Sequence, residues 1–526
     1  MRLSPKSPEH GERRKFSRID FSNGVELITG KEKKTLKPRD LSWGGMSFYS
    51  DDRTLDPKDE VLLKFYPPNR FIDDGFDLSV KIPAKVIGKR LDQNAKEYLA
   101  VKFDNDLKTT SKQIYRSRRK YGYLILPILI LSLIWLKSSN YNYFWYQPLN
   151  NLYSLIVTLY ITSRFFVSMF YRPPSNAHIH PSITFVIPVY NDQNVIRKTI
   201  NACFGSHYPE DKIEVIVIND GSTDHTLSEI KKSQQKYSHL KLINFERNQG
   251  KRHAMAAGAK EASGEIIVYI DSDSIIRRNS LYYLVQGFAD ETVGAVCGHA
   301  YVYNTQENLL TKMQEVRYYV AFRVIKAAEH VFSAVTCCSG SLSAYRKEYL
   351  LEFLDEWLNQ KFLVEPATFG DDRSLTNYML KNYRVLYDSR AGVETVVPSN
   401  WKQFFRQQLR WKKSWFRESL IASKIMWYKH PLTVIFFYAG VLLPLVSPFI
   451  VYLNFIYRPI MLEQWPVYYL LGFLLISLLY SGYYFLRRPN TKWLYGFYFC
   501  FVYISVLSWQ TYYAILTSRR NHWGTR

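Results

Sequence analysis

SITFVIPVY (residues 182–190) is the first of three strand-like segments that decide the fold of this chain; the others are EVIVINDGSTD (214–224) and EIIVYIDSD (265–273). Each begins with an apolar, β-branched run and ends in polar residues, as buried strands do. A helical pattern (NDQNVIRKTINACF) separates the first two segments. Because strand–helix–strand order is typical of a parallel, doubly wound sheet, we expect an α/β domain that binds ligands where its strands end. Those ends carry Tyr190, Asp220 and Asp271.

Asp271 and Asp273 are two carboxylates spaced i, i+2 at the end of the third segment. Together they can hold a hard divalent cation, Mg²⁺ or Mn²⁺, that also binds a diphosphate. Such a pair taken alone is more often a solvated turn. Its place at the end of a strand in this unit is what favours a metal site.

FGDDR (369–373) precedes a helical run, so Asp371 and Asp372 are expected near a helix N-terminus. A carboxylate there is suited to removing a proton from a hydroxyl as a bond forms.

A basic, aromatic helical stretch (WKQFFRQQLRWKKSWF) contains Gln407, Arg410 and Trp411 and is typical of a membrane interface. Its arginine can neutralise a leaving diphosphate, and its tryptophan offers a flat face to a sugar ring. Simple membrane adhesion would account for the same residues.

Five apolar stretches flank this central part: 121–136, 143–170, 432–457, 465–486 and 493–516. Each is long enough to cross about 30 Å of hydrocarbon as a helix, and Trp and Tyr gather at their ends. Basic residues in RSRRKYG (116–122) and RRPNTK (487–492) predict that the N-terminal region and the central domain face the cytoplasm.

Three complete C-terminal spans would leave the basic run SRRNHWGTR outside, against the same charge rule. Pro444 and Pro448 break the stretch 432–457. We therefore expect one of the apolar stretches to be re-entrant or interfacial.

Composition narrows the class of protein. The chain has 526 residues, of which 47% are hydrophobic, so disorder is excluded for most of it. Five cysteines exclude a secreted disulfide scaffold, and the polar start argues against a cleaved signal peptide. The net charge of +23 lies beside the membrane stretches and in an N-terminal arm, so we expect anionic lipid and no nucleic-acid polymer as its partner.

The N-terminal module has short alternating runs (VELIT, MSFYS, VLLKFY, LSVKIPAKVIG, YLAVKFD), which indicate a small antiparallel β-barrel. A basic arm precedes them, and the turn DLSWGG (40–45) lies between two of them. Arginine pairs bidentately with phosphate or guanine, and glycine allows close backbone approach.

This arm and turn resemble the PilZ domain, whose pattern is R-x-x-x-R followed by [D/N]-x-S-x-x-G. The matching residues are Arg14, Arg18, Asp40, Ser42 and Gly45. The resemblance implies binding of cyclic di-GMP, with Arg13 as a further arginine of the site. A generic basic arm near anionic lipid is the alternative.

The ordered set PVYN, NDGSTD, DSD, GDDR and QxxRW, followed by membrane spans, resembles the processive family 2 glycosyltransferases over residues 120–526. VTCCSGSLSAYR, FGDDRSLTNYML, QQLRWKKSWFRE and NHWGTR are most similar to hyaluronan synthases, chitin synthases and nodulation chitooligosaccharide synthases. The resemblance implies a GT-A-like domain that extends a polysaccharide and passes it through its own helices in the bacterial cytoplasmic (inner) membrane. The expected divisions are 1–115 (PilZ-like), 120–171 (transmembrane hairpin), 172–400 (glycosyltransferase), 401–430 (interfacial helices) and 431–526 (transmembrane region and gating tail).

Site roles follow from the resemblance residue by residue. Uridine is expected at Tyr190 and Asp220, and the donor diphosphate near Lys251, Arg252 and Asp271. Asp273 is the expected metal ligand, and Asp372 the general base beside Asp371. Gln407, Arg410 and Trp411 are expected to frame the acceptor, and Trp523, Thr525 and Arg526 to form a gate at the active site.

The implied reaction is inverting transfer from a UDP-sugar, with GlcNAc-containing donors expected from the resemblance alone, and activation by cyclic di-GMP that opens the gate. The named synthases do not usually carry a PilZ module, whereas cellulose and alginate systems use one. A cellulose- or alginate-type synthase is therefore an alternative, as are a non-processive lipid glycosyltransferase and a cyclic di-GMP receptor with an inactive transferase domain. Envelope accessory proteins would be further partners in export.

Overall fold

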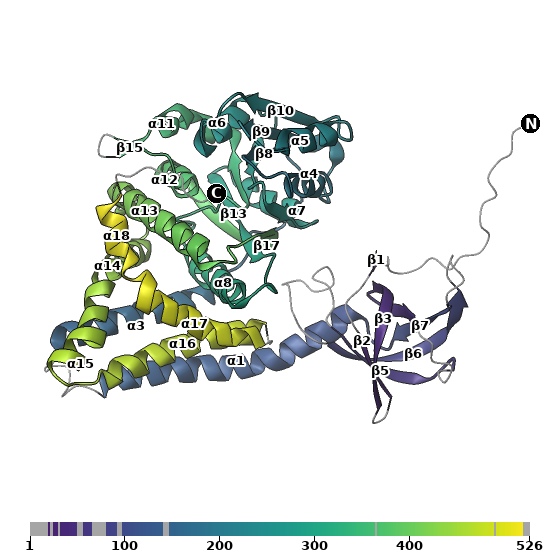
Figure 1. The fold of residues 1–526 in the computed structure, drawn as a ribbon, viewed down its shortest axis with the longest axis horizontal. Helices are drawn as coiled ribbons and strands as arrows, with labels where there is room; N and C mark the ends of the chain where they lie inside the picture. The colour runs from purple at the N-terminus through teal and green to yellow at the C-terminus, as the bar shows by residue number, and fades with distance from the viewer. Residues whose placement is uncertain are drawn as a thin grey trace, which may run out of the picture. The chain divides into compact units, whose positions relative to one another are not determined.

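The computed structural model describes residues 19–20, 25–29, 32–49, 56–65, 80–91, 97–139, 147–362, 365–488 and 491–518. The chain divides into two compact units: Met1–Pro127 with Tyr483–Trp493, and Ile128–Gly482 with Leu494–Arg526. Figure 1 labels the elements along the chain.

A closed antiparallel barrel forms the first unit, as the alternating runs predict. Its strands are β2 (Val25–Thr29), β3 (Glu32–Ser42), β4 (Gly45–Tyr49), β5 (Glu60–Phe65), β6 (Val80–Leu91) and β7 (Glu97–Phe103). The order β3-β2-β5-β6-β7-β4 closes because β3 also pairs with β4. A short strand, β1 (Ile19–Asp20), pairs with the C-terminal end of β3.

Alternate side chains of these strands fill the barrel. Leu27, Phe48, Leu63 and Val101 are at most 2% exposed. Helix α1 (Leu107–Ser138) starts from this core, since the Leu107 N–H donates to the Trp43 carbonyl at 2.9 Å and the Leu107 side chain is buried with the barrel residues. The barrel interior therefore fixes where α1 begins.

An eight-stranded sheet is the centre of the second unit, in the order β10-β9-β8-β11-β14-β13-β17-β12. The strands are β8 (Ile183–Val189), β9 (Ile213–Asp220), β10 (Leu240–Phe245), β11 (Ile266–Tyr269), β12 (Ser274–Ile276), β13 (Val293–Val302), β14 (Ser343–Arg346) and β17 (Arg384–Thr395). A separate two-stranded hairpin contains β15 (Lys361–Phe362) and β16 (Glu365–Pro366).

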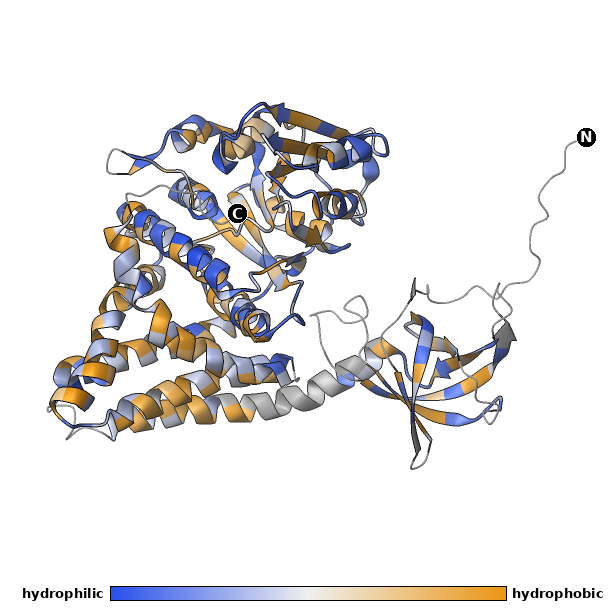
Figure 2. Ribbon diagram, viewed as in Figure 1, coloured by the Kyte–Doolittle hydropathy of each residue, from blue (hydrophilic) through white to orange (hydrophobic). Residues whose placement is uncertain are grey.

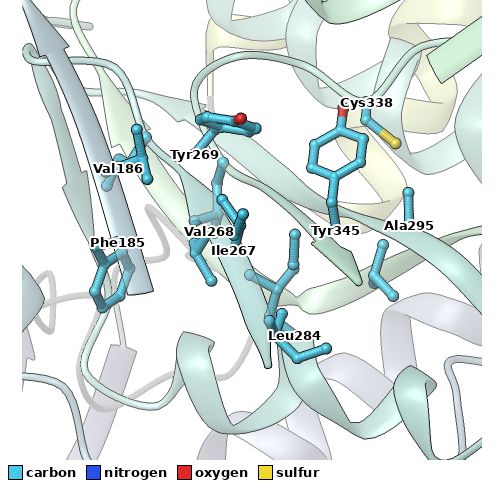
Figure 3. Close-up of a cluster of buried hydrophobic side chains, with 14 of the residues drawn as sticks. Phe185, Val186, Ile267, Val268, Tyr269, Leu284, Ala295, Cys338 and Tyr345 are labelled. Carbon is cyan, nitrogen blue, oxygen red and sulfur yellow. The ribbon is translucent and has the colours of Figure 1, made fainter. Parts of the chain in front are cut away.

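Helices of this unit connect the strands. They are α4 (Ile196–Phe204), η2 (Glu210–Lys212), α5 (Thr226–Gln234), α6 (Lys251–Glu261), α7 (Ser280–Gln286), η3 (Gly287–Ala289), α8 (Leu309–Val320), the π-helix η4 (Ala321–Lys326), α9 (Ala327–Val331), α10 (Lys347–Glu352), α11 (Leu354–Leu358) and α12 (Asp371–Asn382). Figure 3 shows the buried core between sheet and helices, where β8 and β11 side chains lie near Leu284 of α7 and Tyr345 of β14.

The predicted β-α-β unit is confirmed. β8 pairs in parallel with both β9 and β11, so the chain segments after these three strands lie at one edge of the sheet. Strand β10 pairs in parallel with β9 and extends the sheet beyond it. The sequence patterns did not predict this strand.

The predicted parallel pairing does not extend over the whole sheet. β14 runs antiparallel to both β11 and β13, and β12 runs antiparallel to β17. The chain leaves β13 through α8, η4 and α9 and re-enters at the edge where β11 ends, since Ser343 pairs with Tyr269. Because this connection does not cross the sheet, it brings residues 335–342 to the carboxyl end of β11.

The remaining helices lie before β8 and after β17, and all but α13 are mostly apolar or short. They are α3 (Pro148–Ser168), α13 (Trp401–Met426), α14 (Pro431–Tyr452), η5 (Leu453–Tyr457), α15 (Arg458–Met461), α16 (Val467–Arg487), η6 (Thr491–Leu494), α17 (Tyr495–Val502), η7 (Tyr503–Leu507) and α18 (Gln510–Leu516). In Figure 2, α14 and α16 are largely hydrophobic, whereas α13 is largely hydrophilic, which fits its predicted interfacial character.

Two helices of the described residues, Pro431–Met461 and Val467–Arg487, are long and apolar enough to cross a membrane. Thr491–Leu507 and Gln510–Leu516 would add a third if this pair, bent by 44°, is one span. The first predicted hairpin provides α1, whose shorter apolar part is Pro127–Leu136, and α3, so spanning by residues 120–171 stays a prediction.

The predicted break at Pro444 and Pro448 is wrong. Both prolines lie inside the continuous helix α14, and the bend occurs instead between η7 and α18. Membrane helices tolerate proline because neighbouring groups satisfy the freed backbone carbonyls. The last apolar stretch is therefore the structural candidate for a broken or re-entrant segment.

Replacing Leu63 by alanine tests the barrel core. Leu63 is fully buried in β5, so Leu63→Ala is expected to reduce the stability of the barrel by about 2–5 kcal/mol. The measurement is urea-dependent proteolysis of the barrel within the full-length protein. Ile87→Ala on β6 is the control because Ile87 is 52% exposed, and equal effects of the two substitutions would contradict the barrel interior.

Candidate active site

A cavity of about 1320 Å³ opens at the carboxyl ends of β8, β9 and β11. It exceeds the roughly 300–1,000 Å³ usual for a single small ligand, so it has room for two substrates. The predicted substrate, base and metal residues of the central domain that the structure describes all line it: Tyr190, Asp220, Lys251, Arg252, Asp271, Asp273, Asp371, Asp372, Gln407, Arg410 and Trp411.

The loops after β8 and β9 hold each other in place. Asn191 Oδ1 accepts from the Thr223 N–H at 2.8 Å, and the Asn191 N–H donates to Ser222 Oγ at 3.0 Å. Asp220 in turn accepts from the backbone N–H groups of Gln249 and Gly250, at 2.7 and 3.0 Å. Burial raises the pKa of Asp220 despite these two bonds. This carboxylate therefore secures the loop that starts α6.

Lys251, the first residue of α6, forms an ion pair with Asp271. Burial alone would lower the pKa of Lys251, but Asp271, Asp371 and Asp372 raise it above the usual value, so the group is a cation. It provides positive charge where the predicted diphosphate would lie. Asp273 lies 3.5 Å from the Ser274 and Thr395 hydroxyl oxygens and faces the same cavity.

Asp271 and Asp273 can hold a divalent cation only if a bound substrate supplies further oxygen ligands. Within the described residues no group of three or more His, Cys, Asp or Glu side chains is placed to hold a metal ion. Mg²⁺ and similar ions use one or two carboxylates and complete their shell with phosphates and water. Asp273 and Asp271 therefore match a cation that arrives with a nucleotide diphosphate.

Arg252 and Asp371 form a buried ion pair between two motifs far apart in sequence. The Arg252 Nε donates to Asp371 Oδ1 at 2.8 Å, and the two side chains are 4% and 6% exposed. Arg252 Nη1 also donates to the Trp357 carbonyl at 3.0 Å and to Gln360 Oε1 at 3.2 Å. Although it reaches the cavity wall, Arg252 thus holds the start of α6 to the start of α12.

The start of α12 requires glycine. Gly370 has φ of 79°, and a Cβ at this position would lie 2.4 Å from the Ser414 Cβ of α13. Asp372 follows in the first helical turn, where its Oδ1 accepts from the Arg373 N–H at 2.8 Å. The helix dipole favours the negative carboxylate there. Close packing on α13 therefore places this carboxylate at the cavity.

α13 forms the opposite wall. Gln407, Arg410 and Trp411 line the cavity, and the buried Gln407 Oε1 has no hydrogen-bond partner among the described residues. On its inner face the buried Glu418 accepts from Arg417 Nε at 2.8 Å and from Asn377 Nδ2 of α12 at 3.2 Å. A polar network thus fixes the predicted acceptor helix to the predicted base helix.

Several further cavity residues were predicted only as packing residues, as Cys337 was, or not predicted at all. Cys337 Sγ donates to Asp372 Oδ2 across 3.6 Å, and burial raises the pKa of this thiol to about 12, so it stays protonated. Lys326 donates to the Cys337 carbonyl, and Arg317 and Lys412 lie nearer the apolar helices. Arg317 and Lys326 belong to no motif, and their helical run contains other charged residues such as Glu315 and Arg323, so no local signal could have indicated them.

The turn of the barrel domain is ordered as its motif predicts. Ser42 Oγ donates to the Gly45 carbonyl at 3.0 Å, and a Cβ on Gly45 would lie 2.4 Å from the Val101 carbonyl oxygen. Asp40 pairs with Ser47 across β3 and β4. The predicted nucleotide-binding Arg13, Arg14 and Arg18 and the gating residues Trp523, Thr525 and Arg526 lie outside the described residues.

A double-mutant cycle tests the buried pair. Arg252→Met or Asp371→Leu alone leaves one unpaired buried charge and is expected to cost about 3–5 kcal/mol of stability, whereas the double variant should cost less than the sum. Thermal unfolding of the full-length protein in detergent measures this. The exposed pair Lys260–Asp355, 2.9 Å apart, is the control and should couple by at most about 1 kcal/mol; additive effects at both pairs would contradict the buried one.

Comparisons with known proteins agree with this geometry. Residues 184–354 match Glycosyl transferase family 2 and residues 12–117 match the PilZ domain. Hyaluronan synthase of Streptococcus pyogenes serotype M3 is 30% identical over 386 residues, covering 71% of this chain and 90% of that protein. An N-acetylglucosaminyltransferase of Mesorhizobium japonicum is 32% identical over 289 residues, covering 52% and 66%. A solved mannosyltransferase of Pyrobaculum calidifontis covers 70% of this chain and 98% of its own, at 20% identity and a TM-score of 0.46. The chain belongs to the processive family 2 glycosyltransferases of the hyaluronan synthase type and carries a PilZ domain in addition.

Proposed function

We propose that this glycosyltransferase polymerises a β-linked polysaccharide from a UDP-sugar, moves the chain across the cytoplasmic membrane, and is activated by cyclic di-GMP. One observation carries the proposal. A single cavity is bounded by Asp271, Asp273 and Asp372 on the sheet side and by Trp411 on α13, and it continues to Tyr503 of the apolar helices.

Donor binding is assigned to the sheet edge. Tyr190 and Asp220 hold the uridine, and Lys251 and Asp271 face the diphosphate. A divalent cation held by Asp273 with Asp271 would neutralise the diphosphate charge. Arg410, from the other wall, stabilises the same charge as UDP departs.

Transfer is assigned to Asp372. Its carboxylate takes the proton of the acceptor hydroxyl while that oxygen attacks the anomeric carbon from the face opposite UDP, so an α-linked donor gives a β-linked product. The protonated Cys337 donates to this carboxylate at 3.6 Å and orients it. Trp411 stacks on the terminal acceptor sugar, and Gln407 offers an amide oxygen that has no partner among the described residues.

Translocation is assigned to the helices behind this acceptor site. Pro444 of α14 and Tyr503 and Leu507 of η7 line the cavity's membrane side. A polymer that grows past Trp411 would enter the apolar helices directly. The WGTR tail, with Trp523, Thr525 and Arg526, closes the active site between transfers and keeps water from the reaction.

The relatives point to the sugar. They include an N-acetylglucosaminyltransferase and hyaluronan synthase. We therefore assign a GlcNAc-containing donor set.

The PilZ match supports cyclic di-GMP as the ligand of the barrel domain. Arg13, Arg14 and Arg18 bind its guanines and phosphates together with the Asp40–Gly45 turn, which Gly45 lets pack closely on Val101 of β7. Binding releases the tail from its closed position.

A donor screen tests the activity. Full-length protein in nanodiscs is incubated with each UDP- or GDP-sugar, with Mn²⁺ or Mg²⁺ and cyclic di-GMP, and UDP release and product length are measured. A ladder of long polymer is expected, which EDTA should abolish. Asp372→Asn is expected to reduce transfer by about 10²–10⁴-fold while UDP still binds.

Asp355→Asn is the matched control because this carboxylate is on the surface, with its side chain 78% exposed. A single glycolipid product would identify a non-processive enzyme. No UDP release from any donor would leave only the receptor function.

Activation is tested with Arg14→Ala. The ratio of activities with and without cyclic di-GMP should fall to about one, because one of the guanine- and phosphate-binding arginines is lost. Lys81→Ala, an exposed position of β6, should keep the full ratio. Full stimulation of Arg14→Ala would exclude this mode of binding.

A further inference from the structure

Lys326 is a half-buried cation in the wall of the cavity, at the end of the π-helix η4. Its ammonium donates to the Cys337 carbonyl and, at 3.4 Å, to Cys297 Sγ. It also lies 4.9 Å from the centroid of the Phe322 ring. Single π-helical turns within helices are frequent at functional sites. The charge of this π-helix is thus directed at the loop that precedes β14.

The surroundings keep Lys326 charged. Burial alone would lower the pKa of its ammonium, but three neighbouring cysteine sulfurs and Glu329 raise it above the usual value. Burial alone would likewise raise the pKa of Cys297, but a hydrogen bond with the Cys338 thiol and the charge of Lys326 lower it. Because hydrogen bonds from a charged donor are roughly twice as strong as neutral ones, the bond to the loop carbonyl is a firm one.

The loop of residues 336–340, here the cysteine loop, contacts the first turn of α12, where Asp372 lies. The Cys338 N–H donates to Thr376 Oγ1 at 2.8 Å, and that hydroxyl donates to the Asp372 carbonyl at 2.6 Å. Cys337 Sγ lies 3.6 Å from Oδ2 of the Asp372 carboxylate. The cysteine loop therefore contacts both the backbone and the side chain of the proposed base.

The other end of the cysteine loop lies against the donor side of the cavity. A Cβ on Gly340 would lie 3.1 Å from Lys251 Nζ and 3.3 Å from Asp271 Oδ1, so the backbone packs against this ion pair. Glycine permits this close approach. One short loop thus adjoins both the proposed base and the proposed diphosphate-binding pair.

Two side chains of the helices behind the cysteine loop hold its start. Glu329 of α9 accepts from the N–H and the hydroxyl of Thr336, at 3.1 and 3.0 Å. Lys326 of η4 binds the next carbonyl along the chain, that of Cys337. Because the thiol of the same residue reaches Asp372, a shift of this carbonyl would also shift the thiol and the base that it contacts.

We infer that Lys326 is a positioning residue for sugar transfer, which holds the cysteine loop where it meets both Asp372 and the donor diphosphate. The inference rests on the proposed function, in which Asp372 takes the proton of the acceptor. Lys326 acts only through the loop and exchanges no proton with the substrate. A displacement of reacting groups by about 1 Å can cost about 10²-fold in rate, so loss of this anchor should slow transfer while the donor still binds.

Kinetics of two Lys326 variants test this role. UDP release by full-length protein in nanodiscs is measured with the donor that the screen identifies. Lys326→Met removes the charge at a similar side-chain length and should lower kcat about 10–100-fold, with little change in the KM for the donor. Lys326→Arg keeps a charged donor and should restore most of the rate. Lys381→Met, at an exposed position of α12, is the matched control and should keep both constants.

A double-variant cycle separates positioning from general destabilisation. Thr376→Val removes the acceptor of the Cys338 N–H, on the α12 side of the same loop. Because both anchors act through one loop, Lys326→Met and Thr376→Val combined should lose less rate than the product of the two single losses. Losses that multiply, or a raised donor KM in place of a lowered kcat, would overturn the inference.

Hydrogen exchange decides the inference without activity. The peptide 335–342 should exchange faster in Lys326→Met than in the unaltered protein or in Lys326→Arg, whereas a peptide of β9 should be unaffected. Lys326→Gln, which keeps a neutral donor, takes its place if Lys326→Met does not fold. Unchanged exchange in the peptide would overturn the anchor. Absence of UDP release from every donor would overturn the proposed function, and the exchange rates would still show whether Lys326 holds the loop.

Discussion

The buried ion pair between Arg252 and Asp371 is the contact on which the site depends. It joins the starts of α6 and α12, and Gln360, which accepts from Arg252, also accepts from Ser374 and donates toward Glu418 of α13. The starts of α6 and α12 and the helix α13, to which we assign donor, base and acceptor, therefore share one polar network. Because desolvation offsets much of the Coulombic attraction of a buried pair, its main effect is to fix geometry rather than to add stability. That geometry keeps Asp372 and the α13 side chains at one cavity.

This constraint gives α13 two faces with different roles. Its inner face is held by Glu418 to α12, and its other face carries Trp411 and Lys412 to the cavity and to the apolar helices. A helix that only adhered to a membrane would need none of the buried polar contacts. A shift of α13 would move both Trp411 and the cavity wall behind it, so the acceptor site and the polymer path that we propose would change together.

Local sequence patterns were sufficient to predict the elements whose geometry depends on residues close together in the sequence. Apolar runs ending in Tyr190, Asp220 and Asp271 predicted three parallel strands that end at one edge, and alternation predicted the barrel. Long-range pairing was not accessible in this way. The partner of Arg252 lies 119 residues away, so no local pattern predicts their ion pair, and the antiparallel β14 depends on a return path that no periodicity records. Pro444 was predicted to break its helix because a local sequence pattern does not include neighbouring helices. In membrane proteins, such neighbours satisfy the backbone carbonyls that a proline leaves without a hydrogen bond.

The distribution of charge along the cavity matches what a processive enzyme requires. At the sheet side, Lys251 pairs with Asp271 and Arg252 with Asp371, and these ion pairs fix the start of α6. On the polymer path that we propose, strong pairing would trap the product, whereas a bare apolar path would not retain it. Conduction through a membrane protein requires contacts favourable enough to admit a chain and weak enough to release it. Aromatic faces at Trp411 and Tyr503, which both line the cavity, meet both conditions for the polymer path that we propose.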